Sequence, residues 1–106
     1  MANFVLIYSG GSMPESEPEV AKVMDAWGAW FGSLGDSVVD GGNPFGPGAK
    51  HISSNGSVGD GAIGTPATGY SIIKADSVDA ATQAAKGCPV LQGGGEITVY
   101  EVHPAM

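Results

Sequence analysis

Five side chains with acid–base or hydrogen-bonding chemistry stand at the ends of apolar runs or close to glycines: Tyr8, Asp40, His51, Tyr70 and His103. Asp40 precedes Gly41-Gly42, and we expect it to act as a general base or as a hydrogen-bond acceptor for a ligand in a cleft. The alternative is a turn-forming aspartate that accepts hydrogen bonds from local backbone N–H groups, a common role before glycine.

The two histidines carry groups that titrate near neutral pH. His103 follows Glu101 by two residues, so both side chains share one face of a strand and can form a charge-coupled pair. This makes His103 the second catalytic candidate. His51 lies in a glycine-rich segment and is expected to close over a bound ligand. The alternative for both histidines is a solvated side chain.

Tyr8 and Tyr70 end one apolar run and begin another. If the two runs are neighbouring strands, the phenols lie close together and point into a pocket, which makes both tyrosines candidate ligand-binding residues. The alternative is a pair of core aromatics with a satisfied hydroxyl group.

Metal and nucleotide sites are not expected. Two His and one Cys at unrelated spacings give no zinc pattern, so we predict no metal and no cofactor. Gly10-Gly11-Ser12 follows an apolar run but lacks the Lys and the third Gly of nucleotide-binding loops. Cys88 is a weak nucleophile candidate because no His flanks it in the sequence.

Composition limits the partners. The chain has 106 residues, with four Lys, no Arg and 11 acidic residues, and a net charge of −7. Nucleic acids and anionic membrane surfaces need clustered cations, so we expect neither as a partner. The length predicts one domain, 1–106. A single Cys and the lack of a membrane-length apolar run or a leader favour a cytoplasmic protein.

The elements that position these residues follow from apolar periodicity. Strands are predicted at 3–9, 36–40, 69–75 and 96–103, and helices at 17–34 and 78–87. The first helix is expected to bury Val20, Val23, Met24, Trp27, Phe31 and Leu34, with Trp30 at the edge. Residues 41–69 contain nine Gly and three Pro. Within them Asn55-Gly56 predicts a two-residue hairpin turn, on a segment able to act as a lid.

The order β-α-β-(hairpin)-β-α-β predicts an α+β fold, a ferredoxin-like βαββαβ sandwich with an inserted hairpin. Both helices would then cover one face of the sheet. The strands beginning at Phe4 and Ile97 are apolar on both faces, and an uncovered apolar face is unusual for a monomer. We therefore expect a homodimer, sheet facing sheet.

Several segments resemble the YCII-related family, in particular its branch with an Asp-Gly-Pro-Phe motif. They are Trp27-Gly28-Ala29-Trp30-Phe31, Val39-Asp40-Gly41-Gly42-Asn43-Pro44-Phe45, Gly69-Tyr70-Ser71-Ile72-Ile73, Ala85-Lys86-Gly87-Cys88-Pro89 and Val99-Tyr100-Glu101-Val102. The resemblance implies a dimeric α+β barrel. It also implies a His–Asp pair proposed for some members, with the His on the first helix. Asp40 matches the Asp, but the first helix contains no His, and Gly42-Asn43 interrupt the motif.

The function predicted from the sequence is binding of a small organic molecule by a homodimer, in a pocket near Asp40, with weak acid–base catalysis as an addition. The alternative is a binding or assembly module without chemistry. A third reading, cofactor-free oxidation of an aromatic substrate, rests on fold analogy alone.

Overall fold

The computed structural model describes residues 1–11, 16–46 and 48–104 of the chain. Ser12 of the segment Gly10-Gly11-Ser12 lies outside the described residues.

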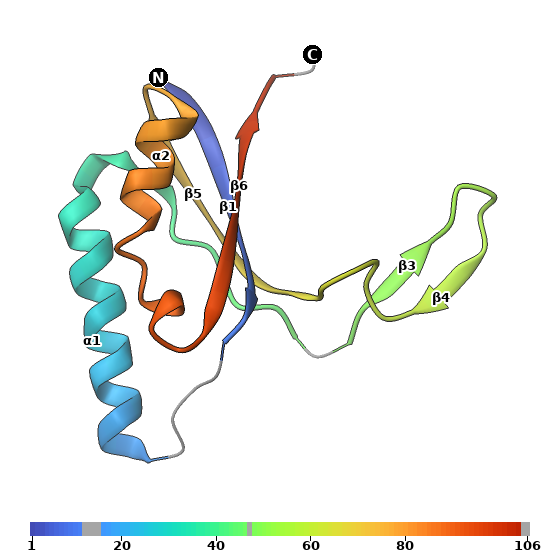
Figure 1. Ribbon diagram of the computed structural model, residues 1–106, viewed down its shortest axis with the longest axis horizontal. Helices are drawn as coiled ribbons and strands as arrows, with labels where there is room; N and C mark the ends of the chain where they lie inside the picture. Colours follow the sequence, from blue (N-terminus) through green and yellow to red (C-terminus); the bar gives the residue numbers. More distant parts are fainter. Residues whose placement is uncertain (12–15, 47, 105–106) are drawn as a thin grey trace.

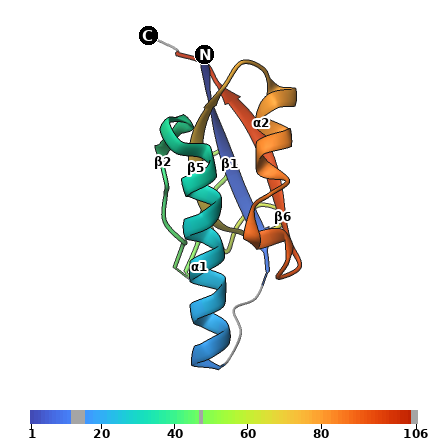
Figure 2. The ribbon, with the colours of Figure 1, turned by 90° about the vertical axis from the view of Figure 1, so that its left-hand side faces the viewer.

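A four-stranded antiparallel sheet with both helices on one face forms the body of the molecule (Figures 1 and 2). The strands are ordered β2-β5-β1-β6. The elements are β1 (Ala2–Gly10), α1 (Glu17–Leu34), β2 (Val38–Asp40), β5 (Ala67–Ala75), α2 (Val78–Ala85) and β6 (Gly95–Val102). Helix α1 connects β1 to β2 across β5, and α2 connects β5 to β6 across β1. This topology confirms the α+β class and is compatible with the ferredoxin-like fold.

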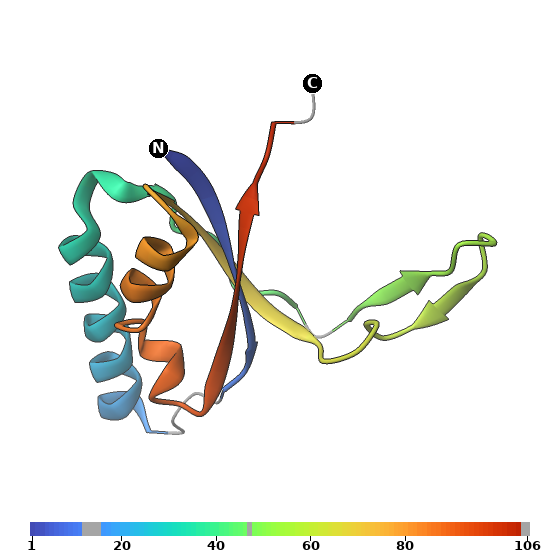
Figure 3. The same cartoon turned by 45° about the horizontal axis from the view of Figure 1, so that its top comes forward.

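The inserted hairpin forms a sheet of its own. β3 (Lys50–Ile52) pairs with β4 (Val58–Asp60) in a separate two-stranded ribbon. The ribbon extends from the side of the main sheet that lies away from the helices (Figures 1 and 3). We call residues 48–64 the arm.

Local signals set the ends of both helices. The Ser16 hydroxyl accepts a hydrogen bond from the Glu19 N–H at 3.4 Å, and Ser77 accepts one from the Ala80 N–H at 3.0 Å. Gly35 ends α1 with a φ of 55° and donates its N–H to the Phe31 carbonyl. These contacts explain why α1 covers the predicted range, 17–34. Helix α2 ends two residues earlier than predicted, at Ala85.

The core lies between the helices and the two central strands. Phe4, Leu6 and Tyr8 of β1 are buried and pair with Ile73, Ser71 and Gly69 of β5, which are buried as well. Because side chains alternate along a strand, the residues between them point to the other face. We call that face, which no described helix covers, the open face. It carries the apolar residues Val5, Ile7, Tyr70, Ile72, Tyr100 and Val102.

Three predictions about local structure are wrong in detail. Asp36 and Ser37 belong to a 3₁₀ turn, η1 (Gly35–Ser37), so β2 starts at Val38. Met24 is 60% exposed, whereas Trp30, expected at the edge of the apolar stripe, is 6% exposed. Trp30 also donates its indole N–H to the Ala84 carbonyl at 3.0 Å, which ties α1 to α2.

The hairpin turn is one residue longer than predicted. The Ser53 carbonyl accepts a hydrogen bond from the Gly56 N–H at 2.8 Å, and Gly56 has a φ of 89°. The Ser53 N–H also donates to the Ser57 carbonyl at 2.7 Å, so the turn between Ser53 and Ser57 has three residues, 54–56, as in a type I turn followed by a left-handed glycine. In the described residues, no helix combines the length and the apolarity needed to cross a bilayer.

Gly42 allows the chain leaving β2 to cross close to β5. A Cβ atom at this position would lie 1.7 Å from the Tyr70 carbonyl oxygen, and the φ of Gly42 is 76°. The chain then pairs with β5 again through a bridge between Pro44 and Gly69. The position therefore requires glycine for both space and backbone conformation.

We predict that Gly42→Ala lowers the free energy of unfolding by about 2 kcal/mol or more, because it combines a left-handed conformation with a backbone clash. Gly41→Ala is the matched control, since a Cβ there would lie 3.8 Å from Phe31, an ordinary contact. We expect the control to change stability by about 0.5 kcal/mol or less. Urea unfolding of both variants measures the difference, and equal losses would contradict a close crossing of Gly42 over β5.

Candidate functional site

A groove of about 970 Å³ lies between α1 and the end of the sheet where β1 finishes. We call it the α1 groove. Val23, Trp27 and Phe31 of α1 line one side, and Tyr8 with residues 41–44 after β2 line the other. The first turns of α1 extend beyond the ends of the strands, so no strand lies beneath them (Figure 2). The size and the mainly apolar lining are typical of small-molecule sites.

A buried chain of hydroxyl groups forms the floor of the α1 groove. The Tyr8 hydroxyl donates to the Ser71 Oγ at 2.7 Å, and the Ser71 hydroxyl donates to the Gly41 carbonyl at 2.8 Å. Ser71 is fully buried, and Tyr8 is 5% exposed. This chain joins β1, β5 and the segment after β2. Because it ends on a backbone carbonyl, which does not take up a proton near neutral pH, it fixes geometry and passes no proton onward.

Burial controls the ionisation of the groups around this chain. Loss of solvation raises the pKa of Tyr8 well above its ordinary value, an effect that the hydrogen bond with Ser71 only partly offsets. The neighbouring Cys88 is 1% exposed, and burial raises the pKa of its thiol too. Both groups are therefore neutral at physiological pH. A neutral buried thiol is a poor nucleophile, so Cys88 is a core residue here.

The ring of Tyr8 connects the floor of the groove to the wall. Trp27 packs edge-on against it, with ring centroids 5.4 Å apart and planes at 74°. Trp27 also packs against Phe31, with ring centroids 5.8 Å apart. These aromatic contacts hold α1 against the sheet at the inner end of the groove.

Asp40 lies at the edge of the α1 groove and shapes a turn. Its Oδ1 accepts a hydrogen bond from the Gly42 N–H at 2.8 Å, and the side chain is exposed. Asp40 therefore has the turn-forming role expected from the sequence as the alternative to catalysis or ligand binding. The next three residues, Gly41, Gly42 and Asn43, line the groove. Asp40 thus borders the groove through the loop that it stabilises.

His103 lies far from Asp40. It follows the last residue of β6, is exposed, and contacts Glu101 with 3.1 Å between Nε2 and Oε2. The predicted His103–Glu101 pair is therefore present. β2 and β6 are opposite edges of the sheet, three strand spacings or about 14 Å apart. Asp40 and His103 of one chain do not form a single acid–base pair.

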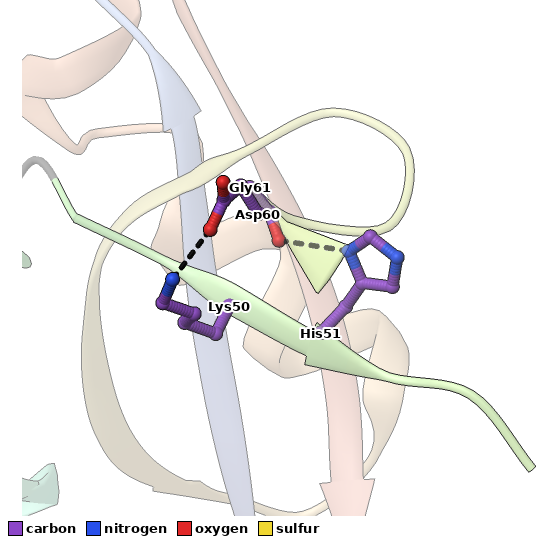
Figure 4. A network of polar contacts seen from close by, with 4 residues as sticks. All are labelled: Lys50, His51, Asp60 and Gly61. Atoms are coloured by element: carbon purple, nitrogen blue, oxygen red, sulfur yellow. Dashed lines mark hydrogen bonds and ion pairs between the residues drawn. The ribbon is translucent and has the colours of Figure 1, made fainter. Parts of the chain in front are cut away.

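His51 lies on the arm, away from the α1 groove. Its ring packs over Gly59, and its Nδ1 lies 3.1 Å from the Gly61 carbonyl oxygen (Figure 4). None of the described arm residues lines the groove, so the arm does not cover it in this structure, and closure of this segment over a ligand stays a prediction.

The two tyrosines predicted to share a pocket point to opposite faces of the sheet. Tyr8 pairs with Gly69 and faces the helices, whereas Tyr70 pairs with Ile7 and belongs to the open face. The Tyr70 ring stacks on Phe45, with centroids 5.8 Å apart and planes at 22°. Tyr70 borders the α1 groove at the crossing with Gly42.

Sequence reasoning missed Ser71 and the glycine crossing. A signal was present, because Ser71 is the one polar residue in the run Tyr70-Ser71-Ile72-Ile73, at a position that alternation places inward. Among the described residues, no group of three or more His, Cys, Asp or Glu side chains is arranged to hold a metal ion.

Comparisons of the chain with protein-family models, with curated proteins and with solved structures found no match.

We predict that alkaline pH destabilises the protein in part through Tyr8. The unfolded chain ionises this phenol near its ordinary pKa of about 10, whereas the folded chain keeps it neutral. The stabilisation is complete below that pH and is lost as pH rises above it, since the unfolded state then binds fewer protons.

The measurement is the free energy of unfolding in urea from about pH 9 to about pH 11. Wild type should lose stability over this range more steeply than Tyr8→Phe, which lacks the ionising group. Parallel curves for the two proteins would contradict the burial of a neutral Tyr8.

Proposed function

We propose that the chain is a homodimeric protein that binds a small, mainly apolar organic molecule in the α1 groove beside Asp40. The observation that carries this proposal is the groove itself, an aromatic and aliphatic site of about 970 Å³ next to a buried hydroxyl pair. We also propose membership of the YCII-related family, supported by the motif segments around Asp40 and by the strand order β2-β5-β1-β6.

Binding without chemistry is favoured over acid–base catalysis. The Asp40 carboxylate already accepts a backbone hydrogen bond, and His103 lies at the opposite edge of the sheet. The Tyr8–Ser71 pair is neutral and leads to a carbonyl. A proton-transfer site needs a group that can give or take a proton within reach of the ligand. Apart from Glu19 and Lys22, which form an exposed ion pair on the first turns of α1, the described groove residues supply mainly shape and apolar contact.

The proposed homodimer is supported by the open face. Strand spacings of about 4.8 Å and rises of about 3.3 Å per residue give this face a projected area of roughly 450 Å². Tyr100 is 57% exposed and Val102 is 44% exposed on it. Covering such a surface with an identical surface removes apolar area from water on both copies, at about 25 cal/mol per Å².

We predict that the neutral probe N-phenyl-1-naphthylamine binds in the α1 groove and that Met24→Gln weakens its binding about fivefold, from the loss of about 1 kcal/mol of apolar contact. Met24 is exposed and lines the groove, so the variant should fold normally. Val78→Gln is the matched control, an exposed apolar residue on α2 outside the groove. Fluorescence titration measures both. Equal effects of the two substitutions would place the probe elsewhere.

A second test with the same probe concerns Asp40 and His103, the two catalytic candidates from the sequence. We expect Asp40→Asn and His103→Ala to leave probe affinity within about twofold of wild type, because Asn retains the oxygen that accepts the Gly42 N–H and His103 is remote. A loss of tenfold or more in His103→Ala would contradict the groove as the binding site.

We predict that wild type sediments as a dimer at micromolar concentration and that Tyr100→Glu weakens the dimer by roughly a hundredfold or more. Each carboxylate would be buried in an apolar interface, and a hundredfold loss corresponds to about 2.7 kcal/mol. Val78→Glu adds the same charge at the first turn of α2, away from the open face, and should stay dimeric. A monomeric wild type, or dissociation of both variants alike, would overturn the dimer.

A further inference from the structure

We propose that the arm packs against a second copy of this chain through the face that carries Ile52 and Val58. The inference rests on the homodimer proposed above and adds to it a contact surface outside the main sheet. Each copy would then contribute its open face and its arm to the same assembly.

The two faces of the arm differ. On one face the imidazole of His51 covers Gly59 and approaches the Gly61 carbonyl (Figure 4). On the other face Ile52 pairs with Val58, and these side chains are 69% and 64% exposed. One face is therefore closed by its own side chain, and the other presents bare apolar surface.

A polar rim borders this apolar pair. Lys50 and Asp60 pair two residues further along the ribbon, so their side chains share the face of Ile52 and Val58, and they form an ion pair. An apolar centre with a charged rim is the usual composition of a protein–protein contact. Lys50 is one of only four cations in the chain, and its charge is balanced within the arm itself.

The arm makes few contacts with the other helices and strands of its own chain. β3 and β4 contact each other, and within the described residues neither makes an extensive contact with another helix or strand. A two-stranded ribbon alone is at best marginally stable in water. The extended arm also gives the chain a radius of gyration of 15.2 Å, against about 13 Å for a compact chain of this length. A surface on another molecule would supply the missing contacts.

A second copy is the partner that the position of the arm favours. The arm extends on the side of the open face, as two views show (Figures 1 and 3). A copy stacked on the open face therefore comes next to the arm. Standard interfaces bury about 800 Å² per partner, and the sheet offers a projected area of only roughly 450 Å². By the same spacings β3 and β4 add a projected area of roughly 100 Å², which brings the total closer to what a stable dimer needs.

Hydrogen exchange on the intact protein tests the contact. Amides of residues 50–60 should exchange at least tenfold more slowly in the wild-type dimer than in the Tyr100→Glu monomer, since the arm loses its partner there. Exchange in β1 serves as the internal reference for the folded body. Equal exchange of the arm in dimer and monomer would overturn the arm contact while leaving the dimer itself intact.

A variant pair gives an independent readout. Ile52→Asp should weaken dimerisation at least tenfold in sedimentation experiments. Ser54→Asp adds the same charge at the turn of the arm and should change it less than threefold. If Ile52→Asp dimerises as tightly as wild type, the arm does not contribute. If wild type itself is monomeric at all concentrations, the proposed homodimer fails first and the arm contact with it.

Discussion

The pairing of β1 with β5 is the constraint on which the rest of the structure depends. These two central strands carry apolar side chains on both faces, and their register decides which residues meet the helices. Phe4, Leu6 and Ile73 build the core on one side, while Val5 and Ile72 are left on the other. Within the described part of the chain, α1 and α2 are the helices that cover the sheet, and both lie on the same face. The open face is left without a covering helix as a direct result of that pairing.

The same register creates the α1 groove. It brings the Tyr8 hydroxyl of β1 to Ser71 of β5, and Ser71 reaches the carbonyl of Gly41 after β2. Three segments distant in sequence are thereby joined at one point. Gly42 allows the last of them to cross closely over β5, which leaves room between the loop and α1. The groove is thus a product of strand pairing and of one glycine.

The features that could be predicted from the sequence are those with local causes. Helix starts at Ser16 and Ser77 and the end of α1 at Gly35 depend on contacts within a few residues. The strands of the main sheet and the α+β class follow from apolar periodicity. The start of β2 was less predictable, because the 3₁₀ turn Gly35–Ser37 that follows α1 leaves no signal in the apolar periodicity.

The candidate site was less predictable because it depends on contacts between distant segments. Nothing in the spacing of Tyr8 and Ser71, 63 residues apart, indicates that their hydroxyls meet. Tyr8 and Tyr70 were placed at the same end of the sheet, yet a shift of one residue in pairing decides which face each ring takes. Likewise, the separation of Asp40 from His103 follows from strand order, which sets the two edges apart.

The first turns of α1 extend beyond the ends of the strands, so the two halves of the helix differ in how firmly they are held. Its C-terminal half is anchored by Trp30, whereas its first turns lack a strand beneath them and begin at a single serine cap. Few buried contacts mean a low free energy of local opening, so fraying should start at this end. One wall of the groove is therefore compliant while the floor is rigid. Such a wall can adjust to ligands of different length at no cost to the core, and a bound ligand would in return stiffen the helix.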